Sequence, residues 1–470
     1  MPVDSGYSIG QVAMSRIPGM IRILSVDDHL VRSSPRQWIR LCLWLSMLLV
    51  SCRQPAPEPV TLRFPSGYRF EPDDISKRSA LTQQFTQRTG IQIQEMQLPE
   101  SIYDQLDLSR KLLKPGATGT DLLGVDVIWS ATLESDLIDL AQYSASEISS
   151  LDPQLLPSYT VNGKLVAIPY EIFVGALEYR SDLLREYGYN HPPKTWDELE
   201  RMAKRIQSGE RAKGNKDFWG YVWPGAASEA LTCNALEWQF SEGGGRIIES
   251  DRTISVNNPA AIRAWQRAQS WIGSISPPAV FLYRELDSMN VFGSGKAAFN
   301  RLWLGTTIIR GGQSPRVYWR THSPMVETGF ASLPGGPGGS AGTLGGSGVA
   351  ISRYSAHRRE AIEFVRFLVQ AQIQSNEKGR SAHLASEIAN LPSVPDLHSD
   401  FQKPVQHDID FVSRPSVEAG VRYQQVSAAY AAAVHAVLTD QKGAPEAAAD
   451  LEKQLVQITG FRTGPPQTRK

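Results

Sequence analysis

Short apolar runs alternate with helical patterns along most of the chain. Residues 61–64, TLRF, form an apolar run that predicts a strand. Residues 79–90 place Leu81 and Phe85 four positions apart, which is the spacing of a helix with one buried face. Residues 91–98 alternate apolar and polar positions with period two, as a strand with one buried face does. A β-α-β start of this kind predicts a parallel, helix-covered sheet.

The segments that follow continue the α/β pattern. Residues 120–143 predict a buried strand that ends at Trp129 and is followed by a helix-like stretch. Residues 162–206 predict a strand, a proline, a second strand and a helix. In that helix Thr195 is the expected N-cap, and Glu198 is its expected capping-box partner.

A short apolar segment near the start of the chain has the features of an export signal. Arg32, Arg36 and Arg40 form a basic flank, and residues 41–50 form an apolar run. That run is far shorter than the ~20 residues that a membrane-spanning helix needs. The pattern is therefore typical of a bacterial export signal. A short membrane anchor is the alternative.

The end of that segment resembles the lipobox of bacterial lipoproteins. Residues 49–52 read LVSC, and the resemblance implies cleavage before Cys52 and acylation of its thiol. We expect residues 1–51 to be a signal region, in which Met20 is an equally good start of translation, and residues 52–59 to be a lipid-anchored tether. The mature protein is then expected on the periplasmic side of the cell membrane or at the cell surface.

Composition and charge narrow the range of functions. The chain has 470 residues, of which 41% are hydrophobic, and 48 basic residues balance 48 acidic ones. Such a balance argues against a nucleic-acid partner. Cys42 leaves with the signal and Cys52 would carry lipid, so Cys233 stands alone and no intramolecular disulfide is expected.

Nine segments along the chain follow one another in a recognisable order. They are DLLGVDVIW (121–129), GKLVAIPY (163–170), YRSDLLREYG (179–188), PPKTWDEL (192–199), WGYVWPGAASEALTCNALEW (219–238), FGSGKAAFNRLW (292–303), GFASLPGG (329–336), GTLGGSGVAIS (342–352) and SRPSV (413–417). In this order they resemble the extracellular solute-binding proteins that serve bacterial carbohydrate ABC importers, and most of all their trehalose/maltose branch. The resemblance covers nearly all of residues 60–465.

The resemblance implies an α/β fold of the type II periplasmic-binding-protein kind. It consists of two lobes, each a helix-covered, mostly parallel sheet, joined by hinge crossings. We expect the first lobe to comprise residues 60–168 and 335–395, and the second lobe residues 169–334 and 396–470. A ligand that contacts both lobes favours the closed form.

The function that the resemblance implies is that of the substrate-binding lipoprotein of an ABC importer. Such a protein is not an enzyme, and it delivers its sugar to the membrane permease subunits. The expected ligand is a disaccharide-like α-glucoside such as trehalose, maltose, sucrose or glucosylglycerol. No cofactor or metal is expected, and we expect a monomer.

Sugars have apolar ring faces, so their sites need aromatic side chains on which a ring can stack. Trp303, at the end of FNRLW, matches the family tryptophan that stacks on the sugar. Trp129 matches another pocket aromatic. For both, a buried core position is the alternative. Tyr170 follows Pro169, and together they should form the first crossing between the lobes.

Polar candidates come from the same segments. Asp126 matches a family aspartate that accepts ligand hydroxyls, with a helix or turn cap as the alternative. Arg414 matches an arginine placed over the pocket, and a surface salt bridge is the alternative. Glu229 matches a family acidic position or is a solvated helix residue. Gly345 and Gly346 should border the cleft, where backbone amides can approach a ligand.

Two positions depart from the pattern of trehalose/maltose binders. Phe173 stands where that branch has an acidic residue, and Ser347 stands where it often has a tryptophan. Glu171 shares a strand face with Phe173 and is a candidate for the missing carboxylate. The identity of the sugar therefore stays open.

Two alternative functions also stay open. A sister branch binds glycerol-3-phosphate or a related polar solute, which requires a cationic pocket. Arg414, Arg301 and Arg353 are its candidate residues. A periplasmic glycosidase would need a carboxylate pair such as Glu285 and Asp287. However, residues two apart on a helix do not face one another.

Overall fold

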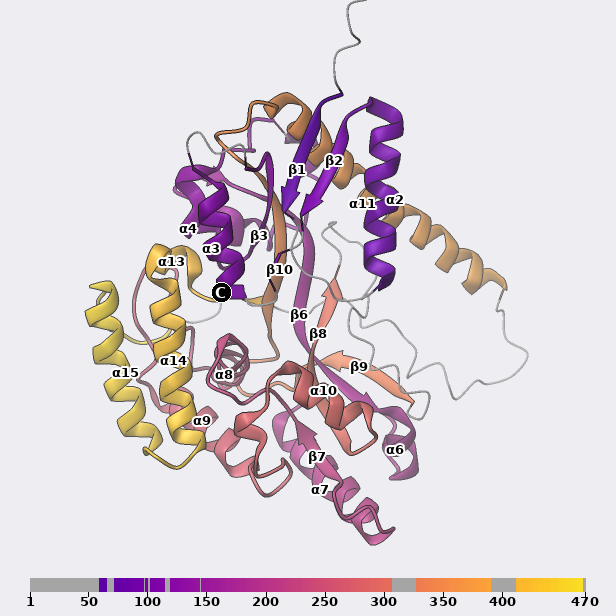
Figure 1. Cartoon of the computed structure of the whole chain (residues 1–470). Helices are drawn as coiled ribbons and strands as arrows, with labels where there is room; N and C mark the ends of the chain where they lie inside the picture. The colour runs from indigo at the N-terminus through magenta and orange to yellow at the C-terminus, as the bar shows by residue number, and fades with distance from the viewer. Residues whose placement is uncertain are drawn as a thin grey trace, which may run out of the picture. The chain divides into compact units, whose positions relative to one another are not determined.

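A long strand, β6 (Ile168–Arg180), runs through the middle of the computed structural model (Figure 1). Its first half pairs with β10 (Gly342–Ile351). Farther along, it pairs with β8 (Ala297–Thr306) and β9 (Thr328–Ser332), and all three pairings are antiparallel. Because β6 changes partners along its length, it connects the upper and lower groups of elements in Figure 1.

The structure describes most of the chain after residue 58. The described residues are 59–65, 72–96, 98–99, 102–114, 119–143, 145–306, 327–389 and 411–467. The predicted export signal, Cys52 and most of the tether lie outside them. Among the described residues, no helix combines the length and apolar character needed to cross a membrane.

The predicted β-α-β start is confirmed. Strands β1 (Thr61–Pro65) and β2 (Gln92–Met96) pair in parallel and are joined by α2 (Pro72–Thr89). Gly90 follows the helix with φ +75°, a left-handed conformation that glycine adopts at little cost and that commonly ends helices.

The strand predicted to end at Trp129 ends three residues earlier. β3 (Leu122–Asp126) is buried and pairs antiparallel with β10. The Asp126 carboxylate accepts a hydrogen bond from the Ile128 backbone N–H at 3.0 Å, which closes a turn. Trp129 lies in that turn, before the short helix α4 (Ser130–Leu133).

Pro169 does not interrupt β6, contrary to the prediction of two strands. Ser347 of β10 is opposite Glu171, whereas Gly348 is opposite Pro169, so Tyr170 is the extra residue of a β-bulge. A bulge tolerates the missing N–H of proline, which explains why the strand continues.

The sheet is mixed rather than mostly parallel, although the α/β class is confirmed. Its strand order is β11-β10-β6-β8-β7, with β3 added on β10 and β9 on β6. Among the described residues, this sheet has two parallel pairs. One is β7 (Trp219–Val222) with β8, and the other is β11 (Phe411–Val412) with β10. Strands β4 (Thr160–Val161) and β5 (Lys164–Leu165) form a separate hairpin.

The predicted helix start at Thr195 is also confirmed. The Thr195 hydroxyl accepts the Glu198 N–H at 3.2 Å. The Glu198 carboxylate accepts the Lys194 N–H at 2.7 Å, one residue before the expected capping-box donor. The longer helices are α3 (Ile102–Leu112), α6 (Ser181–Glu186), α7 (Trp196–Ala212), α8 (Glu229–Ser241), α9 (Pro259–Trp271), α10 (Glu285–Gly293), α11 (Arg358–Ala389), α14 (Tyr423–Leu438) and α15 (Ala444–Thr459). The short ones are α5 (Ala145–Ile148) and α13 (Ser416–Ala419).

Candidate functional site

One face of the sheet carries four of the nine predicted site residues. Asp126 of β3 lies opposite Ser347 of β10, which in turn lies opposite Glu171 of β6. Directly opposed residues project from the same face of a sheet. On the same face, Gly345 lies opposite Phe173, and Trp303 of β8 lies opposite Gly175. The topology therefore brings together residues that are far apart in sequence.

Helix α8 contributes two acidic residues, each of which binds a buried arginine. Glu229, Cys233 and Glu237 are spaced by four positions and therefore share one face of the helix. Glu229 binds Arg414, and Glu237 binds Arg301. We call Arg414–Glu229 the outer pair, because the Arg414 side chain is 5% exposed and the Glu229 side chain 14%. We call Arg301–Glu237 the inner pair, because both of its side chains are only 1% exposed.

The outer pair is held by several groups. Arg414 Nη1 donates to Glu229 Oε1 at 2.7 Å, and its Nη2 donates to the Leu344 carbonyl oxygen at 3.1 Å. The hydroxyl groups of Tyr423 and Ser427 each donate a hydrogen bond to the Glu229 carboxylate. Arg414 is thus buried, so the surface salt bridge expected as its alternative is wrong, as is a solvated Glu229.

Tyr159 lies beside these charges and was not identified from the sequence. Burial raises the pKa of its phenol well above the ordinary value, the Asp126 and Glu171 carboxylates raise it further, and Arg414 opposes them. The phenol therefore stays protonated, and its buried hydroxyl has no hydrogen-bond partner among the described residues. The same is true of Arg414 Nε.

Asp126, Tyr159, Glu171, Glu229 and Arg414 form what we call the polar cluster. Burial acts to lower the pKa of Arg414, but acidic neighbours that include Glu229 and Asp126 outweigh it and raise the pKa well above its ordinary value. Arg414 therefore stays charged. Asp126 also serves as the turn cap that was its alternative role, so its two predicted roles are compatible.

Trp303 borders Gly345 and is half-buried. A Cβ placed on Gly345 would lie 2.8 Å from Cζ3 of Trp303, so the indole edge occupies the space that a side chain would need. The Arg301 guanidinium carbon lies 4.1 Å from the centroid of the same ring. Trp303 is therefore not fully buried, which differs from the core alternative.

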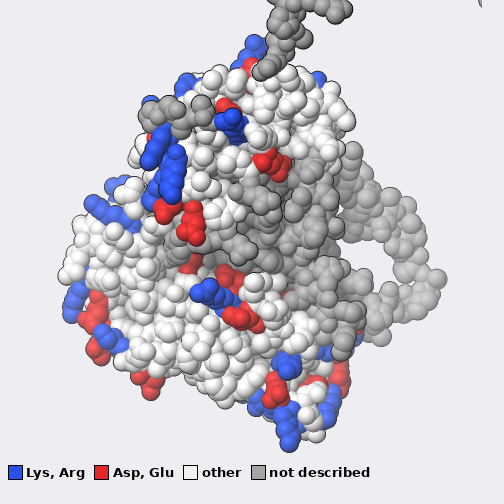
Figure 2. Space-filling view, viewed as in Figure 1, with Lys and Arg blue, Asp and Glu red and all other residues white. Residues whose placement is uncertain are grey.

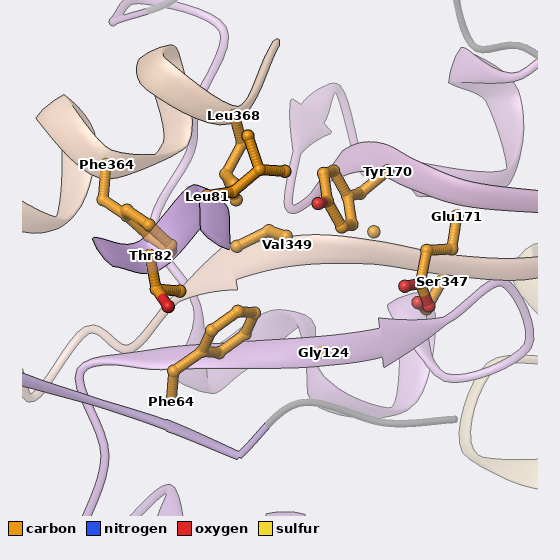
Figure 3. A pocket seen from close by; sticks show the side chains of 11 residues that line it. Phe64, Leu81, Thr82, Gly124, Tyr170, Glu171, Ser347, Val349, Phe364 and Leu368 are labelled. Atoms are coloured by element: carbon orange, nitrogen blue, oxygen red, sulfur yellow. The ribbon is translucent and has the colours of Figure 1, made fainter. Parts of the chain in front are cut away.

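The other two predicted aromatics lie in different surroundings. Trp129 is 4% exposed and packs in the main hydrophobic core, as in its alternative role. Tyr170 is half-buried and lines a small, mostly apolar pocket together with Glu171 and Ser347. Figure 3 shows these three residues at one end of the pocket and Phe364 at the other.

Gly346 has a backbone conformation that favours glycine. Its φ is +107°, and a Cβ there would come within 2.0 Å of the Glu171 carbonyl oxygen. Its own carbonyl oxygen accepts the Val127 N–H at 3.0 Å. Gly346 therefore brings the β10 backbone close to both β6 and the turn after β3.

The three arginines considered for a phosphate ligand do not form one site of unpaired cations among the described residues. Arg301 is bound by Glu237 and Arg414 by Glu229, whereas Arg353 donates to the Ser135 carbonyl oxygen at the surface. Figure 2 shows acidic and basic side chains interspersed on the visible face, with broad uncharged areas between them. Asp287 of the suggested carboxylate pair caps its helix by accepting the Arg284 N–H at 2.8 Å.

Comparison with known proteins agrees with this architecture. Residues 74–375 match the family model described as bacterial extracellular solute-binding protein. A protein of Deinococcus radiodurans named "Probable ABC transporter-binding protein" is 38% identical over 85% of this chain and 94% of its own length. The maltose-bound T. maritima MalE3 is similar in structure, with a TM-score of 0.68 and 29% identity over 85% of this chain and 100% of that one.

A more distant similarity covers part of the chain. The sn-glycerol-3-phosphate-binding periplasmic protein UgpB of Brucella melitensis is 26% identical over 48% of this chain and 50% of its own length.

Proposed function

The chain belongs to the bacterial extracellular solute-binding protein family, and from this we propose that it captures a disaccharide-like α-glucoside for an ABC importer. It is a non-enzymatic, substrate-binding component of the transporter. The glycosidase alternative is therefore wrong. We propose three further properties: the class of sugar, the residues that bind it and the way in which it is delivered to the permease.

The observation that carries the proposal is the position of Trp303 on the same sheet face as Asp126 and Glu171 of the polar cluster. An indole that is not fully buried can offer an apolar surface to a sugar ring. Carboxylates, an arginine and a protonated tyrosine offer acceptors and donors for hydroxyl groups. The proposed ligand-binding residues are Asp126, Tyr159, Tyr170, Glu171, Glu229, Trp303, Gly345, Gly346 and Arg414.

Charge favours a neutral sugar over a phosphate ester. The polar cluster holds three carboxylates and one guanidinium, which is already bound to Glu229. A phosphate dianion would meet net repulsion there, because no unpaired arginine is available in the cluster to neutralise it. The similarity to UgpB keeps glycerol-3-phosphate in the test below but does not outweigh this argument.

We further propose that binding closes two lobes around the ligand. Strands β6 and β10 pair along one half and then continue to different partners, so they are candidates for the hinge. Contacts from both sides of such a crossing would be complete only in the closed form, which the ligand then stabilises. In this proposal the first lobe comprises residues 60–168 and 335–395, and the second lobe residues 169–334 and 396–470.

Delivery to the permease is proposed to occur outside the cytoplasmic membrane. The family is extracellular, and a lipid on Cys52 would keep the protein close to the permease and raise its effective concentration there. Mass spectrometry of the membrane-extracted protein tests the lipid. An N-terminal peptide that begins at an unmodified residue other than Cys52 would contradict it.

The test of the ligand is a thermal-shift panel followed by titration calorimetry. The panel holds trehalose, maltose, sucrose, glucosylglycerol and glycerol-3-phosphate, since a ligand that binds the native state raises the apparent melting temperature. We expect a shift with at least one α-glucoside, and we expect Trp303→Ala to reduce it while leaving binding measurable by calorimetry.

Trp219→Ala is the matched control for that test. Like Trp303, Trp219 is half-buried and has an arginine over its ring, with Cζ of Arg211 4.4 Å from the ring centroid. Unlike Trp303, it lies on β7 and is not among the proposed ligand-binding residues. We expect it to leave the shift intact. If only glycerol-3-phosphate raises the melting temperature, the proposed α-glucoside ligand is wrong and the phosphate ester is the ligand.

A further inference from the structure

We propose that the inner pair, Arg301 and Glu237, is a positioning device that holds the Trp303 ring in the orientation required for stacking on a ligand. This inference rests on the proposed function, in which Trp303 stacks on the sugar. It assigns a binding role to two residues that do not themselves belong to the polar cluster.

The indole of Trp303 is restrained from two directions. Arg301 and Trp303 are two residues apart on β8 and therefore project from the same face. The guanidinium carbon of Arg301 lies 4.1 Å from the ring centroid, the shortest cation-ring distance among the described residues. The edge of the ring meets Gly345, where a Cβ would be only 2.8 Å away.

Arg301 can serve as a rigid support because it is itself fixed. Its Nη2 and Nε donate to the two carboxylate oxygens of Glu237 at 2.5 and 3.1 Å. This bidentate geometry fixes the guanidinium plane as well as its position. Burial acts to lower the pKa of Arg301, but Glu237 outweighs it and the pKa is raised, so the arginine stays charged.

Glu237 is fixed in turn by the strands around it. The Thr343 N–H donates to its Oε1 at 3.0 Å. Gly175 makes room for the pair, because a Cβ there would lie 1.9 Å from Glu237 Oε1 and 2.6 Å from Arg301 Nη2. The pair therefore joins α8, β8 and β10, and its arginine lies against the ring of Trp303.

A fixed ring binds better than a mobile one because ordering a side chain on binding costs free energy. A half-exposed tryptophan without such a support would keep several orientations in the unliganded protein. A pair that served only the stability of the core would have no effect that depends on Trp303. This difference makes the two roles separable by experiment.

The first arm of the test is a double-mutant cycle with maltose as the probe. Arg301→Met combined with Glu237→Gln removes both charges and keeps similar side-chain volumes. Measured by calorimetry, we expect this change to weaken binding about 3- to 10-fold when Trp303 is present, which corresponds to ordering one side chain. In the Trp303→Ala background we expect no further loss. An equal loss in both backgrounds would overturn the proposal.

The second arm needs no ligand. The near-ultraviolet circular dichroism of Trp303 is obtained as the difference between the protein and its Trp303→Phe variant. We expect this difference band to fall by more than half in the inner-pair variant and to be unchanged in Arg211→Met, which removes the arginine over Trp219. An unchanged Trp303 band in the inner-pair variant would overturn the proposal even if the maltose affinity fell.

Arg301→Lys keeps the inference testable if the paired variant does not fold. It retains the charge beside Glu237 and loses the planar group over the ring, so we expect a smaller loss of the band with cooperative unfolding preserved. If the wild-type protein binds none of the panel sugars, the proposed function fails. The circular dichroism arm then still decides whether the inner pair orients Trp303.

Discussion

The two arginine–glutamate pairs on α8 contain the same residue types but have different surroundings. In the inner pair both side chains are 1% exposed, and Glu237 receives a bidentate arginine and a backbone N–H. In the outer pair Glu229 is 14% exposed, and hydroxyl groups of Tyr423 and Ser427 replace part of that coordination.

This difference suggests different consequences for the protein. An arginine that loses its only carboxylate in a dry core becomes an uncompensated charge. A carboxylate that keeps two hydroxyl donors near an exposed surface loses less when its arginine is removed. We therefore expect the inner pair to act mainly on stability and on the Trp303 ring, and the outer pair to act mainly on ligand affinity.

The largest effect is expected from Glu237→Ala. It leaves the Arg301 guanidinium buried without its carboxylate, so the free energy of unfolding should fall by about 3–5 kcal/mol. Urea denaturation followed by circular dichroism measures this. Asp197→Ala, which breaks an exposed pair with Arg267, is the control and should change stability by less than about 1 kcal/mol. Equal losses in the two variants would remove the distinction between a buried and an exposed pair.

A smaller effect on stability and a clear effect on affinity are expected from Arg414→Gln. The change removes charge-assisted hydrogen bonds, so binding of the panel sugar should weaken by about 1.5–3 kcal/mol, or roughly 10- to 150-fold. Stability should fall less than in Glu237→Ala, because Tyr423 and Ser427 still donate to Glu229. Calorimetry measures the loss of sugar affinity, and urea denaturation of the same sample measures the loss of stability. A stability loss as large as that of Glu237→Ala, with affinity unchanged, would reverse the roles of the two pairs.

Gly345→Ala tests the contact between the strand and the ring. The new methyl group would lie 2.8 Å from Trp303, so the indole must shift, and we expect sugar affinity to fall by about 1 kcal/mol, or roughly fivefold. Gly443→Ala is the matched control, since its Cβ would meet no atom within 4 Å. Titration calorimetry of both variants measures the difference. Identical affinities would show that the ring does not depend on this contact.

The smallest effect is expected at Cys233, which lies between the two pairs on α8. Burial raises the pKa of its thiol to about 12, so at pH 8 the reactive thiolate is scarce and labelling requires an opening of the structure. Sugar at about three times its Kd should slow labelling about fourfold, because it stabilises the closed native state. Peptide mass spectrometry of Cys233 follows the rate. Protection that persists in Arg414→Gln at the same sugar concentration would contradict the role of the outer pair in binding.

Local features of the fold were predictable because neighbouring residues specify them. The helix start at Thr195 depends on its own hydroxyl and on the Glu198 N–H three residues later. The end of α2 depends on the positive φ of Gly90. By contrast, the sequence predicts a break between strands at Pro169, because the bulge that accommodates this proline exists only when β10 pairs with β6.

The site shows the same division. Residues that match family segments, such as Asp126, Arg414 and Trp303, were identified from the sequence. The sequence does not point to Tyr159, because a single tyrosine carries no sign that its hydroxyl will lie near the carboxylates of distant segments. The sequence also offered Arg301 as a ligand contact, whereas the structure binds it to Glu237, 64 positions away.

The amino-acid sequence by itself determined the α/β class, the family resemblance, the export signal as a prediction and the helix start at Thr195. These properties depend on periodicity and on short motifs, in which each residue interacts with near neighbours. Only the tertiary structure decided the mixed strand directions, the row formed by Asp126, Ser347 and Glu171, and which carboxylate neutralises each arginine. Those depend on contacts between distant segments, whose energies act only after the chain has packed.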